Sequence, residues 1–237
     1  MQQSNFDDYS YDWWEKKGSM KMLHSMHETR MLFILERIKN RYHAHNNLET
    51  ILKNITILDL GCGGGILSES LCNKGANVTA IDSSQKLIKI AKERAKRKKM
   101  NINYQVSSIE KLAKKGKKFD VIISLEVIEH VTDYKKYLKN IFGSINPNGL
   151  LILSTINRNY FSYLSTIFFA EKILKLVPEG IHDWRSYVKP EEILEAGNIN
   201  KFVLDKICGL SPFPTLKGIE WIRTHTTIAN YIISLKN

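Results

Sequence analysis

The sequence predicts an α/β fold in which helices alternate with the strands of a mostly parallel sheet. Short runs rich in Val, Ile and Leu recur along the chain, and segments with apolar residues at helical spacing separate them. Strands buried on both faces read as nearly continuous apolar runs, because helices cover both sides of a parallel sheet. The first such run leads directly into a glycine-rich turn, which is typical of ligand-binding α/β sheets. At 237 residues the chain is long enough for one sizeable domain with added segments.

Seven strands are expected, of which the first five alternate with helices. The five lie at residues 55–60, 77–81, 103–106, 119–124 and 150–155. Helices are expected at residues 66–74, 84–97 and 134–144, with Ser83 as the cap of the second. Residues 202–208 and 227–234 are expected to close the sheet as a hairpin. The result is a seven-stranded sheet with helices on both faces.

The first 47 residues (1–47) precede the sheet. They open with an aromatic-rich stretch that includes Trp13 and Trp14, and residues 28–41 carry apolar side chains at helical spacing. We expect an N-terminal helical lid that packs over a pocket. Arg30 falls in the first turn of the expected helix, where the helix dipole disfavours a cation, and this indicates an outside partner such as a carboxylate.

An insertion interrupts the core after the fifth strand. Residues 157–198 hold apolar positions at helical spacing, with basic residues near the end of the apolar stretch. Such a segment either packs over an active site or rests on a membrane surface. The remaining residues, 48–156 and 199–237, form the core of what we expect to be a single domain.

The chain carries a net charge of +11, and much of the excess is clustered at residues 89–99 and 111–118. Such clusters are compatible with nucleic acid, with anionic lipid or with a solvated surface. Neither cluster has the interleaved aromatic residues of a single-strand platform, so no nucleic acid is expected as a partner.

Cysteine usage and the amino terminus bear on the compartment. The cysteines Cys62, Cys72 and Cys208 form no Cys-x-x-Cys motif, which indicates a reducing compartment. The acidic amino terminus resembles neither a signal peptide nor a transit peptide, and no apolar run reaches the roughly 20 residues that span a bilayer. We therefore expect a cytoplasmic protein.

The strongest functional signal lies between residues 57 and 65, which read Ile-Leu-Asp-Leu-Gly-Cys-Gly-Gly-Gly. A strand, a glycine turn and a helix follow one another here, so a ligand can approach the backbone closely at the carboxyl end of the strand. Asp82 ends the next apolar run, about twenty residues beyond the first glycine, where a carboxylate can accept hydrogen bonds from both ribose hydroxyls of an adenosine. The nicotinamide fingerprint would need glycine where Ile66 stands.

The motif is instead Asp59-x-Gly61-x-Gly63-x-Gly65. It resembles motif I of the class I methyltransferases, which bind S-adenosylmethionine. The resemblance implies a Rossmann-like seven-stranded sheet. It also implies that this motif and Asp82 contact the cofactor.

A second set of polar residues follows the fourth strand. If the residues after this strand turn helical, Glu126, Glu129 and His130 lie at positions i, i+3 and i+4 on one face. Two carboxylates and an imidazole there could hold a divalent cation, and oxygen-rich ligation favours Mg²⁺. Alternatively, His130 acts as a general base that a neighbouring glutamate orients, without a metal. His182, at the end of the insertion, is a further candidate base or substrate contact.

Beyond motif I, the chain resembles the ubiquinone-biosynthesis O-methyltransferase family from about residue 6 to the carboxyl end. The residues that carry the resemblance are Trp13-Trp14, Leu23-His24, Arg30, residues 58–67, Glu126, Glu129-His130-Val131, Asn157-Arg158-Asn159, Val177-Pro178, Gly180, His182-Asp183 and Lys189-Pro190. Residues 157–190 are the specific part, because few other methyltransferases carry such an insertion.

This resemblance implies an S-adenosylmethionine-dependent enzyme that methylates the phenolic hydroxyl of polyprenyl catechol intermediates and demethylubiquinol. Arg30 would hold the methionine carboxylate, and Leu125 would border the adenosine where the family tends to carry methionine. Glu126, Glu129 and His130 match positions that are associated with Mg²⁺ in eukaryotic relatives. A phenol has a pKa near 10, so the reactive phenolate needs either such a metal or a base to form.

The family resemblance also implies an anionic membrane surface as a partner, and with it a peripheral position at a bacterial inner membrane. Other ubiquinone-biosynthesis enzymes are expected as further partners. Two departures from the family pattern stand out. The usual Asn-Pro before the arginine is His27-Glu28, and the first glycine of a Pro-Gly-Gly turn is Asn148, which tolerates the left-handed conformation.

Other functions compete with this one. A methyltransferase of a soluble carboxylate or phenol shares the cofactor motif and differs only in its substrate. An RNA methyltransferase fits the basic clusters, but amino-methylating nucleic-acid enzymes commonly show Asn/Asp-Pro-Pro-aromatic where residues 124–127 read Ser-Leu-Glu-Val. A non-catalytic cofactor-binding protein is the remaining class.

Overall fold

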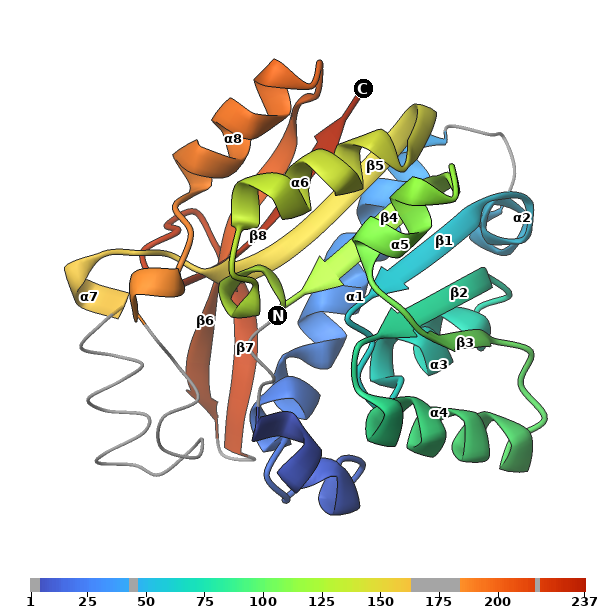
Figure 1. Cartoon of the computed structure of the whole chain (residues 1–237). Helices are drawn as coiled ribbons and strands as arrows, with labels where there is room; N and C mark the ends of the chain where they lie inside the picture. Colours follow the sequence, from blue (N-terminus) through green and yellow to red (C-terminus); the bar gives the residue numbers. More distant parts are fainter. Residues whose placement is uncertain (1–4, 43–46, 163–183, 216–217) are drawn as a thin grey trace.

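The structure is a computed structural model that describes residues 5–42, 47–162, 184–215 and 218–237. Within these residues, eight strands form one sheet in the order β3-β2-β1-β4-β5-β8-β6-β7 (Figure 1). The strands are β1 (Thr56–Leu60), β2 (Asn77–Asp82), β3 (Asn103–Val106), β4 (Phe119–Leu125), β5 (Ile145–Ile156), β6 (Val203–Thr215), β7 (Gly218–Thr224) and β8 (Asn230–Lys236). Strands β1 to β5 pair in parallel, and β8, β6 and β7 continue the sheet with antiparallel pairings.

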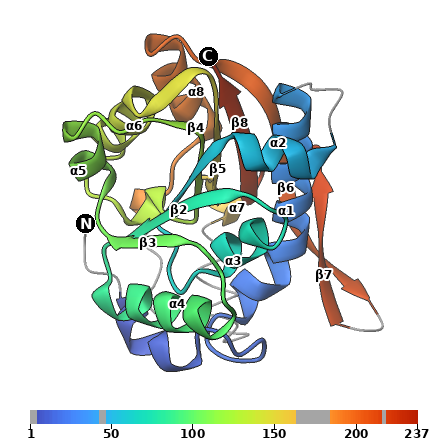
Figure 2. The same cartoon turned by 90° about the vertical axis from the view of Figure 1, so that its right-hand side faces the viewer.

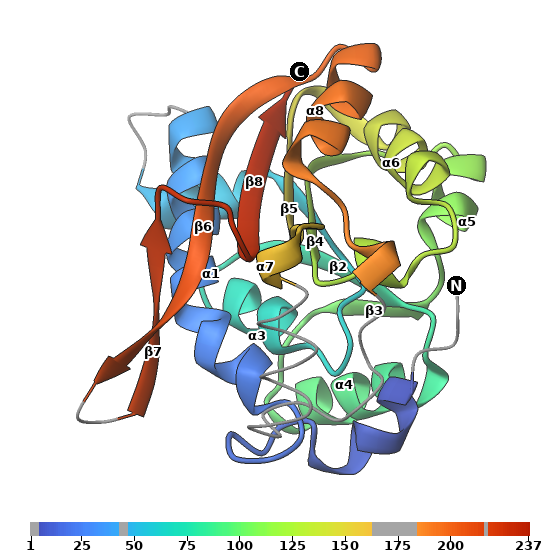
Figure 3. The same ribbon diagram turned by 90° about the vertical axis from the view of Figure 1, so that its left-hand side faces the viewer.

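Helices cover both faces of the sheet, as the sequence predicted (Figures 2 and 3). One face packs on α1 (Lys21–Arg41), α2 (Leu48–Asn54), α3 (Ile66–Cys72) and α4 (Gln85–Arg97), and the other on α5 (Ile109–Lys114), α6 (Tyr134–Gly143) and α8 (Pro190–Ile199). Successive strand side chains alternate between the faces, so Ile57 and Leu58 of β1 belong to two separate cores. The shorter helices are η1 (Asn5–Asp12), η2 (Ile128–His130), α7 (Tyr160–Ser162) and η4 (Trp184–Ser186).

The expected count of seven strands is wrong, because β7 adds an eighth. Strand β6 does not end near residue 208 but continues to Thr215 and pairs with β7. Proline has no N–H and is tolerated in a strand only where no ladder bond is lost. Pro212 and Pro214 lie beyond Leu210, where the pairing of β6 with β8 ends and β7 is the single neighbouring strand. A segment with two prolines does not read as a strand from its sequence.

Helix α1 begins at Lys21 and not at residue 28, so Arg30 lies in the middle of the helix and not in its first turn. The His27-Glu28 departure is therefore accommodated inside a continuous helix. The cap of α4 is Ser84 and not Ser83, because the Ser84 hydroxyl accepts a hydrogen bond from the backbone N–H of Leu87 at 3.0 Å. Short helices α2, α5 and α8 lie outside the predicted set.

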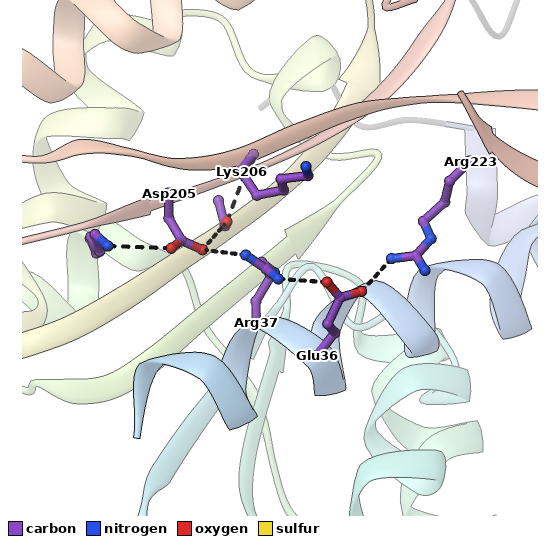
Figure 4. Close-up of polar contacts among 7 residues, drawn as sticks. Glu36, Arg37, Asp205, Lys206 and Arg223 are labelled. Atoms are coloured by element: carbon purple, nitrogen blue, oxygen red, sulfur yellow. Dashed lines mark hydrogen bonds and ion pairs between the residues drawn. The ribbon is translucent and has the colours of Figure 1, made fainter. Parts of the chain in front are cut away.

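A polar network ties α1 to the antiparallel part of the sheet (Figure 4). The buried guanidinium of Arg37 contacts Asp205 of β6 at 3.4 Å and Glu36 at 2.6 Å. Glu36 also pairs with Arg223 of β7 at 2.5 Å, and Asp205 accepts a hydrogen bond from Ser234 of β8 at 2.8 Å. This network fixes α1, which carries Arg30 into the site, against three strands.

Asp205→Ala is expected to lower the free energy of unfolding by about 2 kcal/mol, because it leaves the Arg37 guanidinium buried with one partner fewer. Urea denaturation measures the change. The matched control is Glu49→Ala, which removes a pair with Lys53 in which both side chains are exposed, and it should leave stability nearly unchanged. Equal effects of the two substitutions would contradict the structural role of the network.

Among the helices that the structure describes, none combines the length and the apolar character needed to cross a bilayer.

Candidate active site

The glycine turn follows β1 and leads into α3, as the sequence predicted. Gly61, Gly63 and Gly65 have φ angles of +78°, +52° and +91°, a region that residues with a side chain rarely adopt. The backbone N–H groups of Gly61 and Cys62 donate to the carbonyl of Ile81 at 2.8 and 3.0 Å, which holds the turn against the end of β2. The turn thus lies at the carboxyl edge of the parallel strands, where α/β sheets bind their ligands.

Asp82, the last residue of β2, is bonded to this turn. Its Oδ2 accepts from the N–H of Gly63 at 2.9 Å, and its Oδ1 accepts from the N–H of Ser84 at 2.8 Å. Burial is the main reason why the pKa of this carboxyl is raised, and the two N–H bonds oppose the rise. A carboxylate offers about four acceptor sites, so these bonds leave capacity for the hydroxyl donors of a ribose.

Asp59 contacts α3. The side chain is buried, and its Oδ2 accepts from the Ser68 hydroxyl at 2.5 Å. Burial raises the pKa of Asp59 to about 7. This bond ties the end of β1 to the first turn of α3, on either side of the glycine turn, and so helps to shape the site.

Arg30 reaches the same edge of the sheet from α1. It is 3% exposed, and its Nη2 donates to Oε1 of Glu126 at 2.7 Å and to the sulfur of Met26 at 3.2 Å. Its Nε has no hydrogen-bond partner among the described residues. A buried guanidinium with an unsatisfied donor is suited to a carboxylate, and the methionine part of S-adenosylmethionine carries one. The residues present therefore fit this cofactor.

The acidic residues after β4 occupy two different environments. Glu126 has a φ of +53°, and its Oε1 accepts from Arg30 and from the Ser154 hydroxyl at 2.7 Å. Glu129 is buried, and its Oε2 accepts from the Thr155 hydroxyl at 2.8 Å. Burial raises the pKa of Glu129 to about 8, and the neighbouring charge of Glu126 adds to the rise.

The expected helical face of Glu126, Glu129 and His130 does not form. Glu126 precedes the short helix η2 in a left-handed conformation, so the i, i+3, i+4 spacing does not apply to it. Among the described residues no three His, Cys, Asp or Glu side chains lie together as a metal ion would require. Arg30 already neutralises Glu126, and the described side chains as they stand do not fit a Mg²⁺ site.

The other predicted residues are placed as follows. His130 ends η2, where its backbone N–H donates to the carbonyl of Val127 at 2.9 Å. Leu125 ends β4 and pairs with Ser154 of β5. His182 lies outside the described residues. Ser154 and Thr155, which donate to Glu126 and Glu129, were not predicted from the sequence. Two polar residues at the end of an apolar strand were a signal that could have indicated them.

Five parallel strands in the order β3-β2-β1-β4-β5, with the ligand turn after β1, are the arrangement of the class I S-adenosylmethionine-dependent methyltransferases, and this chain is one of them. A family model described as a methyltransferase domain matches residues 51–213. More narrowly, the chain belongs to the family of ubiquinone biosynthesis O-methyltransferases. It is 40% identical over 227 residues to the protein of that name from Pelagibacter ubique, which covers 96% of this chain and 93% of the relative. The relative of the same name from Coxiella burnetii is 39% identical, over 97% of this chain and 92% of its own length.

Solved structures agree with the fold. The magnesium protoporphyrin IX methyltransferase from Synechocystis with bound S-adenosylhomocysteine aligns with a TM-score of 0.68, over 98% of this chain and 94% of that one. The same enzyme with S-adenosylmethionine bound gives a TM-score of 0.62. Sequence identities of 18% and 19% limit these similarities to the fold.

Proposed function

We propose that this chain transfers the methyl group of S-adenosylmethionine to a phenolic oxygen of polyprenyl catechol intermediates and of demethylubiquinol. The names of its relatives support the substrate class. The structural observation that carries the chemistry is the position of the Glu126–Glu129 turn. A Cβ added at Gly61 would lie 2.3 Å from Val127, so this turn packs directly on the glycine turn. Two carboxylates therefore flank the cofactor site.

S-adenosylmethionine, when bound, supplies an electrophilic methyl group on a sulfonium and leaves as the neutral thioether. The chain's own residues must then hold the cofactor and remove the phenolic proton. Arg30 binds the methionine carboxylate through the guanidinium donors that Glu126 does not use, and Asp82 binds the ribose. Alignment of the phenolic oxygen with the methyl group supplies much of the remaining acceleration.

Glu129 is the proposed proton acceptor. A general base works best when its pKa lies near the operating pH, and the pKa of Glu129 is raised to about 8 by burial and by Glu126. The proton therefore passes from the phenolic oxygen to the Glu129 carboxylate as the new carbon–oxygen bond forms. His130 and His182 are the alternative acceptors that the sequence offers.

A membrane surface is the proposed meeting place with a substrate that carries a polyprenyl tail. The net charge of +11 favours an anionic surface, and Tyr160 and Phe161, near the start of the segment 157–198, are exposed and would enter the lipid, whereas Val188 and Ile193 of the same segment are buried in the core. This association places the chain peripherally at the inner membrane of a bacterium. Cosedimentation with anionic liposomes is the expected result, and equal binding to neutral liposomes would contradict the electrostatic part.

The decisive experiment is the formation of a methoxy product from a catechol that carries a short prenyl tail, with and without Mg²⁺. Product formation that persists in excess EDTA is expected from a carboxylate base. If EDTA abolishes activity and Mg²⁺ restores it, a metal ion and not Glu129 activates the phenol. Methylation of an untailed catechol at the same kcat/KM would contradict the assignment of a prenylated substrate.

A further inference from the structure

Gly64 is a glycine whose backbone does not require one. Unlike its neighbours Gly63 and Gly65, it has no φ in the left-handed region. A Cβ added at Gly64 would nevertheless lie 2.4 Å from Cδ1 and 2.7 Å from Nε1 of the Trp13 indole. Atoms at those distances overlap, so the absence of a side chain at Gly64 is required by the indole that packs on it. The same ring would lie 2.3 Å from a Cβ at Gly63.

Trp14 contacts the same glycine by a different route. Its indole Nε1 donates to the carbonyl of Gly64 at 3.1 Å. The Arg94 guanidinium of α4 stacks on the Trp14 ring, 3.5 Å from its centroid. Arg94 in turn donates to both carboxylate oxygens of Glu69 of α3, at 2.7 and 3.3 Å. The position of Trp14 is thus fixed by two helices that flank the glycine turn.

The amino-terminal segment makes one more contact at this edge. Asp7 accepts a hydrogen bond from the hydroxyl of Ser84, the residue that caps α4. The backbone N–H of Ser84 also donates to Asp82, which binds the N–H of Gly63. Residues 7–14 therefore contact the glycine turn directly through two indoles and indirectly through Asp82.

We propose that Trp13 and Trp14 are positioning residues of the cofactor site, and that Arg94 and Glu69 hold Trp14 in place. They hold the glycine turn in the conformation that receives S-adenosylmethionine, and neither needs to touch the substrate. A turn that is already in its binding conformation binds more tightly, because less ordering remains to be done when the ligand arrives. The proposal rests on the assignment of this turn as the cofactor site.

Gly64→Ala tests the proposal through binding alone. We expect at least a tenfold loss of S-adenosylhomocysteine affinity by titration calorimetry, because the new methyl group displaces the Trp13 indole. In a Trp13→Ala background the same Gly64→Ala change should have no further effect, because the clash is gone. The matched control is Gly143→Ala, where an added Cβ meets nothing within 4 Å, and its affinity should equal that of the wild type.

Trp14→Phe keeps an aromatic ring for Arg94 to stack on and removes the hydrogen bond to Gly64. We expect the KM for S-adenosylmethionine to rise while kcat stays near its wild-type value, since the bond is made equally in ground and transition states. Thermal melting of each variant checks that it is folded. Wild-type affinity of Gly64→Ala, or an equal Gly64→Ala effect with and without Trp13, would overturn the proposal. Absence of S-adenosylhomocysteine binding by the wild type would instead overturn the cofactor assignment itself.

Discussion

Arg30→Ala is expected to weaken the binding of S-adenosylhomocysteine by about 100-fold, which corresponds to about 3 kcal/mol. Arg30 is 3% exposed and its Nε has no partner among the described residues, and in the proposed binding mode the ligand carboxylate accepts from this donor. A charge-assisted, bidentate contact of this kind is stronger than a neutral hydrogen bond. Titration calorimetry with the purified variant measures the loss.

The same experiment with 5′-methylthioadenosine separates the carboxylate contact from the rest of the site. This ligand keeps the adenosine and the sulfur but has no carboxylate, so Arg30→Ala should bind it as the wild type does. Lys39→Ala is the control, because Lys39 is an exposed cation on the same helix, and it should bind both ligands as the wild type does. Equal losses for both ligands would show that Arg30→Ala distorts the site as a whole. Unchanged affinity for S-adenosylhomocysteine would remove Arg30 from cofactor binding.

The α/β fold was readable from the sequence because its signals are local. Apolar runs, helical spacing and the glycine turn each depend on a few neighbouring residues, and the parallel direction of strands β1 to β5 follows from their alternation with helices. Their order in the sheet does not follow from that alternation. The start of α1 was not readable, because its cap position, Met20, makes no side-chain capping bond. Strand β7 was missed because no local pattern announces it. It is stabilised by contacts with the distant helix α1, where Trp221 is buried and its indole N–H donates to Ser25 at 3.0 Å.

The types of residue in the candidate site could be predicted from the sequence, but their arrangement in space could not. Glu126 adopts a left-handed backbone that costs a non-glycine residue free energy, and its carboxylate is held by Arg30 from α1 and Ser154 from β5. These partners are 96 and 28 residues distant along the chain, so no local pattern announces them. The expectation of a metal site followed from a helical spacing that this backbone does not adopt. The contact between Trp13 and Gly64 is likewise visible only in three dimensions.

Glu129→Gln is expected to lower kcat by at least about 100-fold while the affinity for S-adenosylhomocysteine stays unchanged. The amide keeps the shape of the side chain and its contact with Thr155 but cannot accept the phenolic proton. Since the wild-type base must be ionised, kcat should rise with pH and level off above about 8. An exposed glutamate on α8 provides the control, because Glu195→Gln should keep wild-type turnover at every pH.

Ionisation of Glu129 is expected to raise kcat but to lower the free energy of unfolding. The pKa of Glu129 is about 8 in the folded chain, against an ordinary value of 4.5, so between these values unfolding releases a proton. The free energy of unfolding therefore falls as pH rises through this interval and becomes flat above it, a loss on the order of 5 kcal/mol. Glu129→Gln stays neutral at every pH and is spared this loss. All other titrating groups are common to both proteins, so the difference between their urea-denaturation curves at pH 5 and pH 8 isolates Glu129.

The pH profiles of kcat and of stability together decide whether the buried Glu129 carboxyl both accepts the phenolic proton and lowers stability at high pH. If Glu129 is the base, kcat reaches half of its plateau near the pH of about 8 at which the fall of stability levels off, and both pH dependences disappear in Glu129→Gln. If the pH profile of kcat keeps its midpoint in Glu129→Gln, another group accepts the phenolic proton, and His130 is the next residue to replace. A stability difference that does not change with pH would mean that Glu129 is already ionised in the folded chain. In that case Arg30 would have to neutralise both carboxylates, and the proposed division of labour between Glu126 and Glu129 would be wrong.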